Sequence, residues 1–151
     1  MVATFLCATF AFVPSAAPLV SNPTAFATVA PVVGMASTPS GNGYWQVGGD
    51  GAIFSTGDAP FLGSLGGVRL NRPITGIAGT TSGRGYWMVA TDGGIFSFGD
   101  ARFFGSTGGI RLNQPIVGMS ATTPSSGYWF VAADGGIFGF GDAKFYGAAV
   151  G

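Results

Sequence analysis

The chain has 151 residues and no net charge, because six basic side chains balance six acidic ones and charged residues make up only 8% of the total. This balance excludes the basic surface of a nucleic-acid-binding protein. The chain has no histidine, which excludes a Ser-His-Asp or Cys-His catalytic arrangement. Its single cysteine excludes a disulfide framework within the chain. We also expect no cofactor.

The first 27 residues form an apolar leader. The run Val2–Val13 has the length of a signal-peptide hydrophobic region, and Ala25-Phe26-Ala27 supplies the small-x-small pattern that precedes cleavage. The basic segment that normally opens a signal peptide is missing, so an uncleaved apolar leader is the alternative. Pro14 and Pro18 interrupt the run before it reaches the roughly 20 residues of a membrane span. We therefore expect an exported chain without a stable membrane span in its mature part.

The remaining residues, 28–151, are predicted to form one repeat domain. Three Gly-Tyr-Trp motifs place Trp45, Trp87 and Trp129 at intervals of 42 residues (87 − 45 and 129 − 87). A fixed period of this length is the signature of a repeat architecture. The predicted units span residues 31–72, 73–114 and 115–151.

The second unit shows the secondary structure that we expect in all three. Its apolar runs are short, are separated by Gly, Asp and Ser, and lack the spacing of an amphipathic helix. The pair Asp92-Gly93 tolerates the positive φ of a hairpin turn. The unit is therefore predicted to be a four-stranded antiparallel sheet, with strands at residues 73–79, 86–90, 95–98 and 102–105.

Both faces of each predicted sheet are apolar. In the strand 86–90, Tyr86 and Met88 point to one side, while Trp87 and Val89 point to the other. A sheet with two apolar faces must be covered on both sides. Repeats of about 40 to 50 residues with four strands each are typical of β-propeller blades. We therefore predict an all-β protein with three propeller-type blades.

The number of blades raises the question of closure, because closed propellers have about four to eight blades. Three blades are expected to form an open arc, to close by assembly as a homo-oligomer, or to lack additional blades. A β-solenoid, which has no closure requirement, is the alternative fold.

The repeat also resembles a known family. Its motif is Gly-Tyr-Trp-x-Val-Ala-x-Asp-Gly-Gly-Ile-Phe-x-Phe-Gly-Asp-Ala-x-Phe-(Tyr/Phe)-Gly-Ser, followed by Leu-Asn-x-Pro-Ile-x-Gly-Met. Over residues 31–147 it is similar to tandem repeats of secreted and cell-surface proteins of actinobacteria, which often accompany hydrolase or peptidoglycan-active domains. The resemblance implies an extracellular location and a propeller-like β fold, and it implies no catalytic residue. The first unit departs from the motif at Gly48, Thr56 and Pro60-Phe61-Leu62.

Repeated aromatic residues are the first candidates for ligand binding. An aromatic ring suits the apolar C–H face of a sugar, and identical units would add avidity. The alternative is that these rings fill the core between blades. The candidates are Trp45, Trp87, Trp129, Tyr44, Tyr86 and Tyr128.

Two arginines are the second set of candidates. Arg69 and Arg111 occupy the same place in the long connection that follows the last predicted strand of a unit. Exposed loops at one end of a propeller are a natural binding surface. A solvated loop whose charge serves solubility is the alternative.

Repeated aspartates are the only candidates for metal binding. Asp50, Asp92 and Asp134 occupy the Asp-Gly turn, and a second set (Asp58, Asp100 and Asp142) lies eight residues later. One strand separates the two sets, so they lie at opposite ends of it and do not suit a glycosidase carboxylate pair. Turn capping is the favoured interpretation of both sets, and calcium binding at Asp50, Asp92 and Asp134 is the alternative.

These patterns predict a secreted or cell-surface protein that binds without catalysis. Carbohydrate or another cell-wall polymer is the expected partner. The alternatives are a structural or protein-interaction array and an accessory region of a larger secreted hydrolase.

Overall fold

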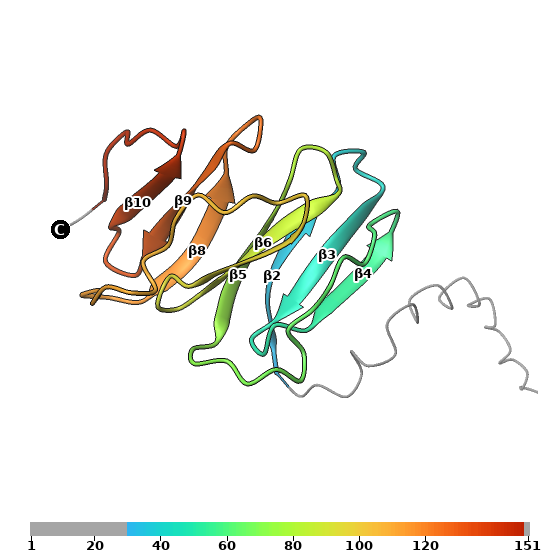
Figure 1. Cartoon of the computed structure of the whole chain (residues 1–151), viewed down its shortest axis with the longest axis horizontal. Coiled ribbons are helices and arrows are strands. Elements are labelled where there is room, and N and C mark those ends of the chain that lie inside the picture. The colour runs from blue at the N-terminus through green and yellow to red at the C-terminus, as the bar shows by residue number, and fades with distance from the viewer. Residues whose placement is uncertain (1–29, 150–151) are drawn as a thin grey trace, which may run out of the picture.

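The structure is a computed structural model that describes residues 30–149, so the predicted leader (residues 1–27) lies outside the described residues. Nine strands form three separate antiparallel sheets in residues 30–149 (Figure 1). The first sheet contains β2 (Val32–Ser37), β3 (Gly43–Gly48) and β4 (Ile53–Gly57). The second contains β5 (Ile74–Gly79), β6 (Gly85–Ala90) and β7 (Ile95–Gly99). The third contains β8 (Ile116–Ala121), β9 (Gly127–Ala132) and β10 (Ile137–Gly141).

The all-β prediction is confirmed, since every regular element between residues 30 and 149 is a strand. That part of the chain accordingly offers no helix that is long and apolar enough to cross a membrane. Each sheet is a meander whose middle strand pairs with both neighbours. The register repeats as well, because a bulge follows Val32, Ile74 and Ile116 at the start of each first strand.

The prediction of four strands per unit is wrong: each sheet has three. In the second unit the segment 102–105 is an irregular loop. The backbone groups of this loop bond to side chains and not to a neighbouring strand. The indole N–H of Trp87 donates to the carbonyl of Arg102. The Tyr128 hydroxyl accepts a hydrogen bond from the amide of Phe104 and donates one to the carbonyl of Gly105. Gly105 has a φ of 134°, a conformation that glycine adopts readily and other residues rarely do. The side chains thus replace the expected ladder.

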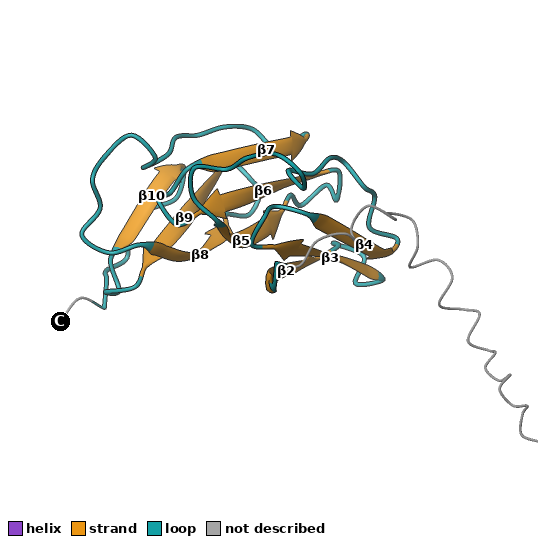
Figure 2. Cartoon of the chain, turned by 90° about the horizontal axis from the view of Figure 1, so that it is seen from below, coloured by secondary structure: helices purple, strands orange, loops and turns teal. Residues whose placement is uncertain are grey.

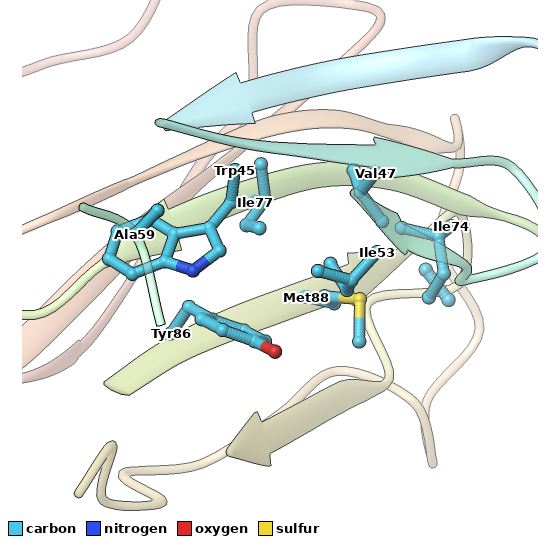
Figure 3. Close-up of a cluster of buried hydrophobic side chains, with 9 residues drawn as sticks. Trp45, Val47, Ile53, Ala59, Ile74, Ile77, Tyr86 and Met88 are labelled. Carbon is cyan, nitrogen blue, oxygen red and sulfur yellow. The ribbon is translucent and has the colours of Figure 1, made fainter. Parts of the chain in front are cut away.

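The three sheets stack in chain order (Figures 1 and 2). We call the side of each sheet that carries its tryptophan (Trp45, Trp87 or Trp129) the trailing face. The opposite side, which carries its tyrosine (Tyr44, Tyr86 or Tyr128), is the leading face. The trailing face of the first sheet packs on the leading face of the second, and the second sheet packs on the third in the same way. Figure 3 shows the first of these two cores, in which the indole of Trp45 faces the ring of Tyr86.

The first strands of the sheets lie closest together. A Cβ atom added at Gly34 would come within 3.4 Å of the Gly76 Cα, and one added at Gly76 would come within 3.5 Å of the Gly118 Cα. Hydrogen bonds also cross both junctions, from the amide of Ile74 to the carbonyl of Gly49 and from the amide of Ile116 to the carbonyl of Thr91. Each sheet is therefore anchored to the next along the start of its first strand.

Candidate functional site

The structure places two of the three candidate tryptophans in the core. Trp45 and Trp87 are fully buried between sheets, and their indole N–H groups donate to the carbonyls of Pro60 and Arg102 at 2.8 and 2.7 Å. Trp129 donates to the carbonyl of Lys144 at 2.7 Å and is half-buried, because no further sheet follows within the described residues. In this arrangement the indole faces of Trp45 and Trp87 offer no surface on which a sugar could stack.

The candidate tyrosines link consecutive units. Tyr86 is fully buried, and its hydroxyl donates to the carbonyl of Gly63 at 2.6 Å and accepts from the amide of Leu62 at 3.2 Å. Tyr128 repeats this pattern at 2.8 and 2.9 Å with Gly105 and Phe104. Tyr44, on the uncovered leading face of the first sheet, is half-buried. The tyrosine of one unit therefore holds the loop of the unit before it.

Burial also governs the acidity of these phenols. It raises the pKa of Tyr86 to about 12, and the hydrogen bonds to Leu62 and Gly63 offset only part of this effect. Burial likewise raises the pKa of Tyr128. Loss of a proton would place a charge in an apolar space, which is unfavourable. Both hydroxyls are therefore neutral structural groups at physiological pH.

The candidate arginines are exposed on the connections between sheets. Arg111 and Arg72 line a shallow cleft of about 350 Å³ together with Asp92, Asn113 and Gln114. Arg69 lies at the equivalent place of the first connection. The cleft is open, and it brings together one of the two predicted arginines and an aspartate of the turn set.

The first set of aspartates shapes the hairpin turns. In each unit the carboxylate accepts a hydrogen bond from the backbone amide two residues later, at 2.9 to 3.0 Å. This is the geometry of an Asx turn. The pairs are Asp50 with Ala52, Asp92 with Gly94, and Asp134 with Gly136. Residues 30–149 contain no group of three or more His, Cys, Asp or Glu side chains that could hold a metal ion.

The second set of aspartates closes the opposite end of each sheet. Asp58 accepts hydrogen bonds from the hydroxyls of Thr38 at 2.8 Å and Ser40 at 2.5 Å. These two bonds hold the pKa of Asp58 below its usual value, and the bond from Ser40 has the larger effect. Asp100 accepts equivalent bonds from Thr80 and Ser82. The bonds tie the loop after the first strand to the turn after the third, so they have a structural role.

A further set of repeated residues was not among the sequence-based candidates. Phe61, Phe103 and Phe145 occur at intervals of 42 residues in the loop that follows the third strand of each sheet. Their side chains are 49%, 65% and 65% exposed. Phe61 and Phe103 each precede another sheet and are still uncovered, so their exposure does not come from a missing neighbour. The sequence did contain a signal: the phenylalanine is the same in all three repeats, whereas the residue before it differs (Pro60, Arg102 and Lys144).

Exposed phenylalanines at equivalent positions of stacked sheets form a row, which we call the phenylalanine row (Phe61, Phe103 and Phe145). Stacked sheets lie about 10 Å apart, so the three rings can contact successive parts of one extended molecule. Such a surface is suited to weak, repeated apolar contacts. The chain was compared with protein-family models and with curated proteins, and neither comparison gave a match.

Proposed function

We propose that this chain is a secreted or cell-surface binding module that recognises a carbohydrate polymer without catalysis. The observation that carries the proposal is the phenylalanine row. A large exposed apolar patch marks an interaction site, and we treat the three rings as one such surface because they recur at equivalent positions of stacked sheets. An exposed aromatic ring suits the apolar face of a pyranose, and three equivalent rings suit a polymer with repeated sugars.

The finer architecture also belongs to this proposal. We infer that the three sheets are propeller-type blades in an open arc. The close approach of the first strands, at Gly34 and Gly76, supports this. The β-solenoid is less well supported, because its sheets would continue from repeat to repeat, whereas here each unit has its own sheet. An arc of blades would present the phenylalanine row along its outer side.

The neighbours of the row favour an acidic polymer. Arg102 and Lys144 immediately precede Phe103 and Phe145, and both are exposed. A cation beside an aromatic ring allows the same sugar unit to be bound through its apolar face and its acidic group. A cell-wall glycan with carboxylate or phosphate groups is therefore the expected ligand class.

Binding without catalysis is consistent with how the carboxylates are used. All three aspartates of the first set bond to turn amides, and Asp58 and Asp100 bond to Thr and Ser hydroxyls. A glycosidase instead needs two carboxyl groups about 5 to 9.5 Å apart around the scissile bond. The repeated aspartates stabilise turns and are not used as an acid–base pair in this proposal.

The experiment is retention of the full chain on insoluble cell-wall glycan, with release by soluble fragments. Replacement of Phe61, Phe103 and Phe145 by Ala should abolish retention, and single replacements should each weaken it about tenfold. A matched control replaces Val68, Ile110 and Val117, which are exposed to a similar degree, by Ala and should keep retention. Equal retention by both triple variants, or no retention of the unchanged chain on neutral and acidic glycans, would contradict the proposal.

A protein-interaction array is the second candidate function. One observation favours it: the leading face of the first sheet and the trailing face of the third are apolar and uncovered within the described residues.

A further inference from the structure

The two internal junctions are built from the same pair of faces. At both, the trailing face of one sheet meets the leading face of the next. The ring centroids of Trp45 and Tyr86 are 5.4 Å apart at the first junction, and those of Trp87 and Tyr128 are 5.6 Å apart at the second. The chain therefore shows twice how these two faces fit together.

One copy of each face remains uncovered within residues 30–149. On the leading face of the first sheet, Val32 is 52% and Met35 is 60% exposed, whereas the equivalent Ile74 and Ile77 of the second sheet are 2% and 6% exposed. These side chains match residues that are buried at an internal junction. Within residues 30–149 no sheet precedes the first one, and Val32 and Met35 are exposed for that reason, although they are apolar like their buried equivalents.

The trailing face of the third sheet shows the same contrast. Tyr146 is 83% exposed, whereas its equivalents Leu62 and Phe104 are half-buried against the next sheet. Trp129 is half-buried, although Trp45 and Trp87 are fully buried. This face keeps the tryptophan and the aromatic loop residue that the internal junctions use.

The polar groups of a junction also have counterparts at the two ends. Internally, a tyrosine hydroxyl donates to a glycine carbonyl of the preceding loop. The equivalent pair at the ends is Tyr44 and Gly147, and Gly147 has a φ of 118°, close to the 134° of Gly105. Internally, the amide of Ile74 also donates to the carbonyl of Gly49 in the preceding sheet. At the two ends, the equivalent amide is that of Val32 and the equivalent carbonyl is that of Ala133. The two uncovered faces thus match in polar as well as apolar groups.

We propose that a second copy of this chain covers these faces by packing head to tail. The leading face of one copy contacts the trailing face of its partner, so each junction joins two different surfaces, and a two-fold axis relates the two junctions of a pair. Residues 30–149 of two copies supply six sheets, which falls within the about four to eight of closed propellers. A ring of two copies therefore contains two such junctions and leaves neither face bare.

The junction between copies is weaker than the internal ones. Gln46 and Thr56 stand on the leading face of the first sheet where the second sheet has Met88 and Phe98. Less apolar area is therefore buried between copies, and less burial gives less stabilisation. The pair separates into folded single chains on dilution, which makes the interface measurable as an equilibrium.

The first measurement is the solution mass of the full chain by light scattering over a range of concentrations. A mass of two chains that falls toward one chain on dilution supports the proposal. A mass of one chain at all concentrations overturns it. Tyr44→Phe removes the hydroxyl that would bond to Gly147, and it should raise the dissociation constant of the pair about tenfold.

Substitutions at the two ends test whether the packing is head to tail. Met35→Lys damages only the leading face and Tyr146→Glu damages only the trailing face. Both positions are exposed in the single chain, so both variants should fold, as circular dichroism will show. Each variant alone should have the mass of one chain. Val68→Lys, on an exposed connection away from both faces, is the control and should keep the mass of two chains.

Mixing the two variants supplies the decisive result. An equimolar mixture contains one intact leading face and one intact trailing face, so paired chains should return. If like faces packed together instead, one variant alone would remain paired and the mixture would gain nothing. That result would overturn the head-to-tail proposal, as would two variants that both stay paired.

Discussion

The Tyr86 hydroxyl donates a 2.6 Å hydrogen bond to the carbonyl of Gly63, which lies 23 residues earlier, in the loop of the preceding unit. The same hydroxyl accepts from the amide of Leu62. One phenol thus satisfies two backbone groups of the loop, which would bond to β4 if the loop were a fourth strand. The bond explains both why the loop is irregular and how consecutive sheets are held in register.

Removal of this hydroxyl should destabilise the fold. Tyr86→Phe leaves the amide of Leu62 and the carbonyl of Gly63 without their partner, which costs about 1–3 kcal/mol. Chemical denaturation measures the free energy of unfolding. The matched control is Tyr146→Phe, at a ring that is exposed, and it should change stability by less than about 0.5 kcal/mol. Equal effects of the two substitutions would show that the bond to Gly63 contributes nothing.

Alkaline pH should also weaken the fold. The pKa of Tyr86 is raised by burial to about 12 from its usual 10.0. A raised pKa means that the unfolded chain loses the proton first, so this contribution to stability is complete below about pH 10 and is lost as the pH rises through about 12. Burial raises the pKa of Tyr128 as well, so tyrosinate absorbance followed against pH should show a late change to which both phenols contribute, and Tyr86→Phe should reduce it. A late change of the same size in the variant would contradict the assignment.

Glycine is required where the loop meets the next sheet. Gly105 has a φ of 134°, and a Cβ atom there would overlap the ring of Phe140. Gly105→Ala should therefore cost about 2–4 kcal/mol through backbone strain and overpacking. Gly109→Ala is the control, because no atom lies within 4 Å of the added Cβ. Thermal unfolding of both variants tests the difference, and a similar midpoint for the two would refute it.

One buried hydroxyl should be dispensable. The Ser55 Oγ is buried and makes no hydrogen bond in the described residues. Ser55→Ala removes an unsatisfied polar atom and should raise the free energy of unfolding by about 1 kcal/mol. Ser97, at the same place in the second sheet, is exposed, so Ser97→Ala should be nearly neutral. A loss of stability in Ser55→Ala would mean that its hydroxyl has a partner after all.

Local sequence patterns predicted the strands well. Gly-Tyr-Trp begins the second strand of each sheet and Asp-Gly makes the turn that follows, because alternation and turn residues act over a few neighbours. The sequence allowed two roles for Trp45 and Trp87, ligand binding and core packing, and no local pattern could decide between these roles. The structure buries both side chains. The exposed Phe61 and Phe103 were missed for the same reason, since their environment depends on the neighbouring sheet.

The sequence by itself determined the all-β class, the 42-residue period and the Asp-Gly turns. These depend on backbone preference and on the alternation of side chains along a strand. Only the tertiary structure decided that each sheet stops at three strands. It also decided that Tyr86 bonds to the loop at Gly63 and that Phe103 stays at the surface. Those outcomes depend on contacts between units, because the backbone groups of a loop bond to a tyrosine 23 residues later in the chain and not to the neighbouring strand.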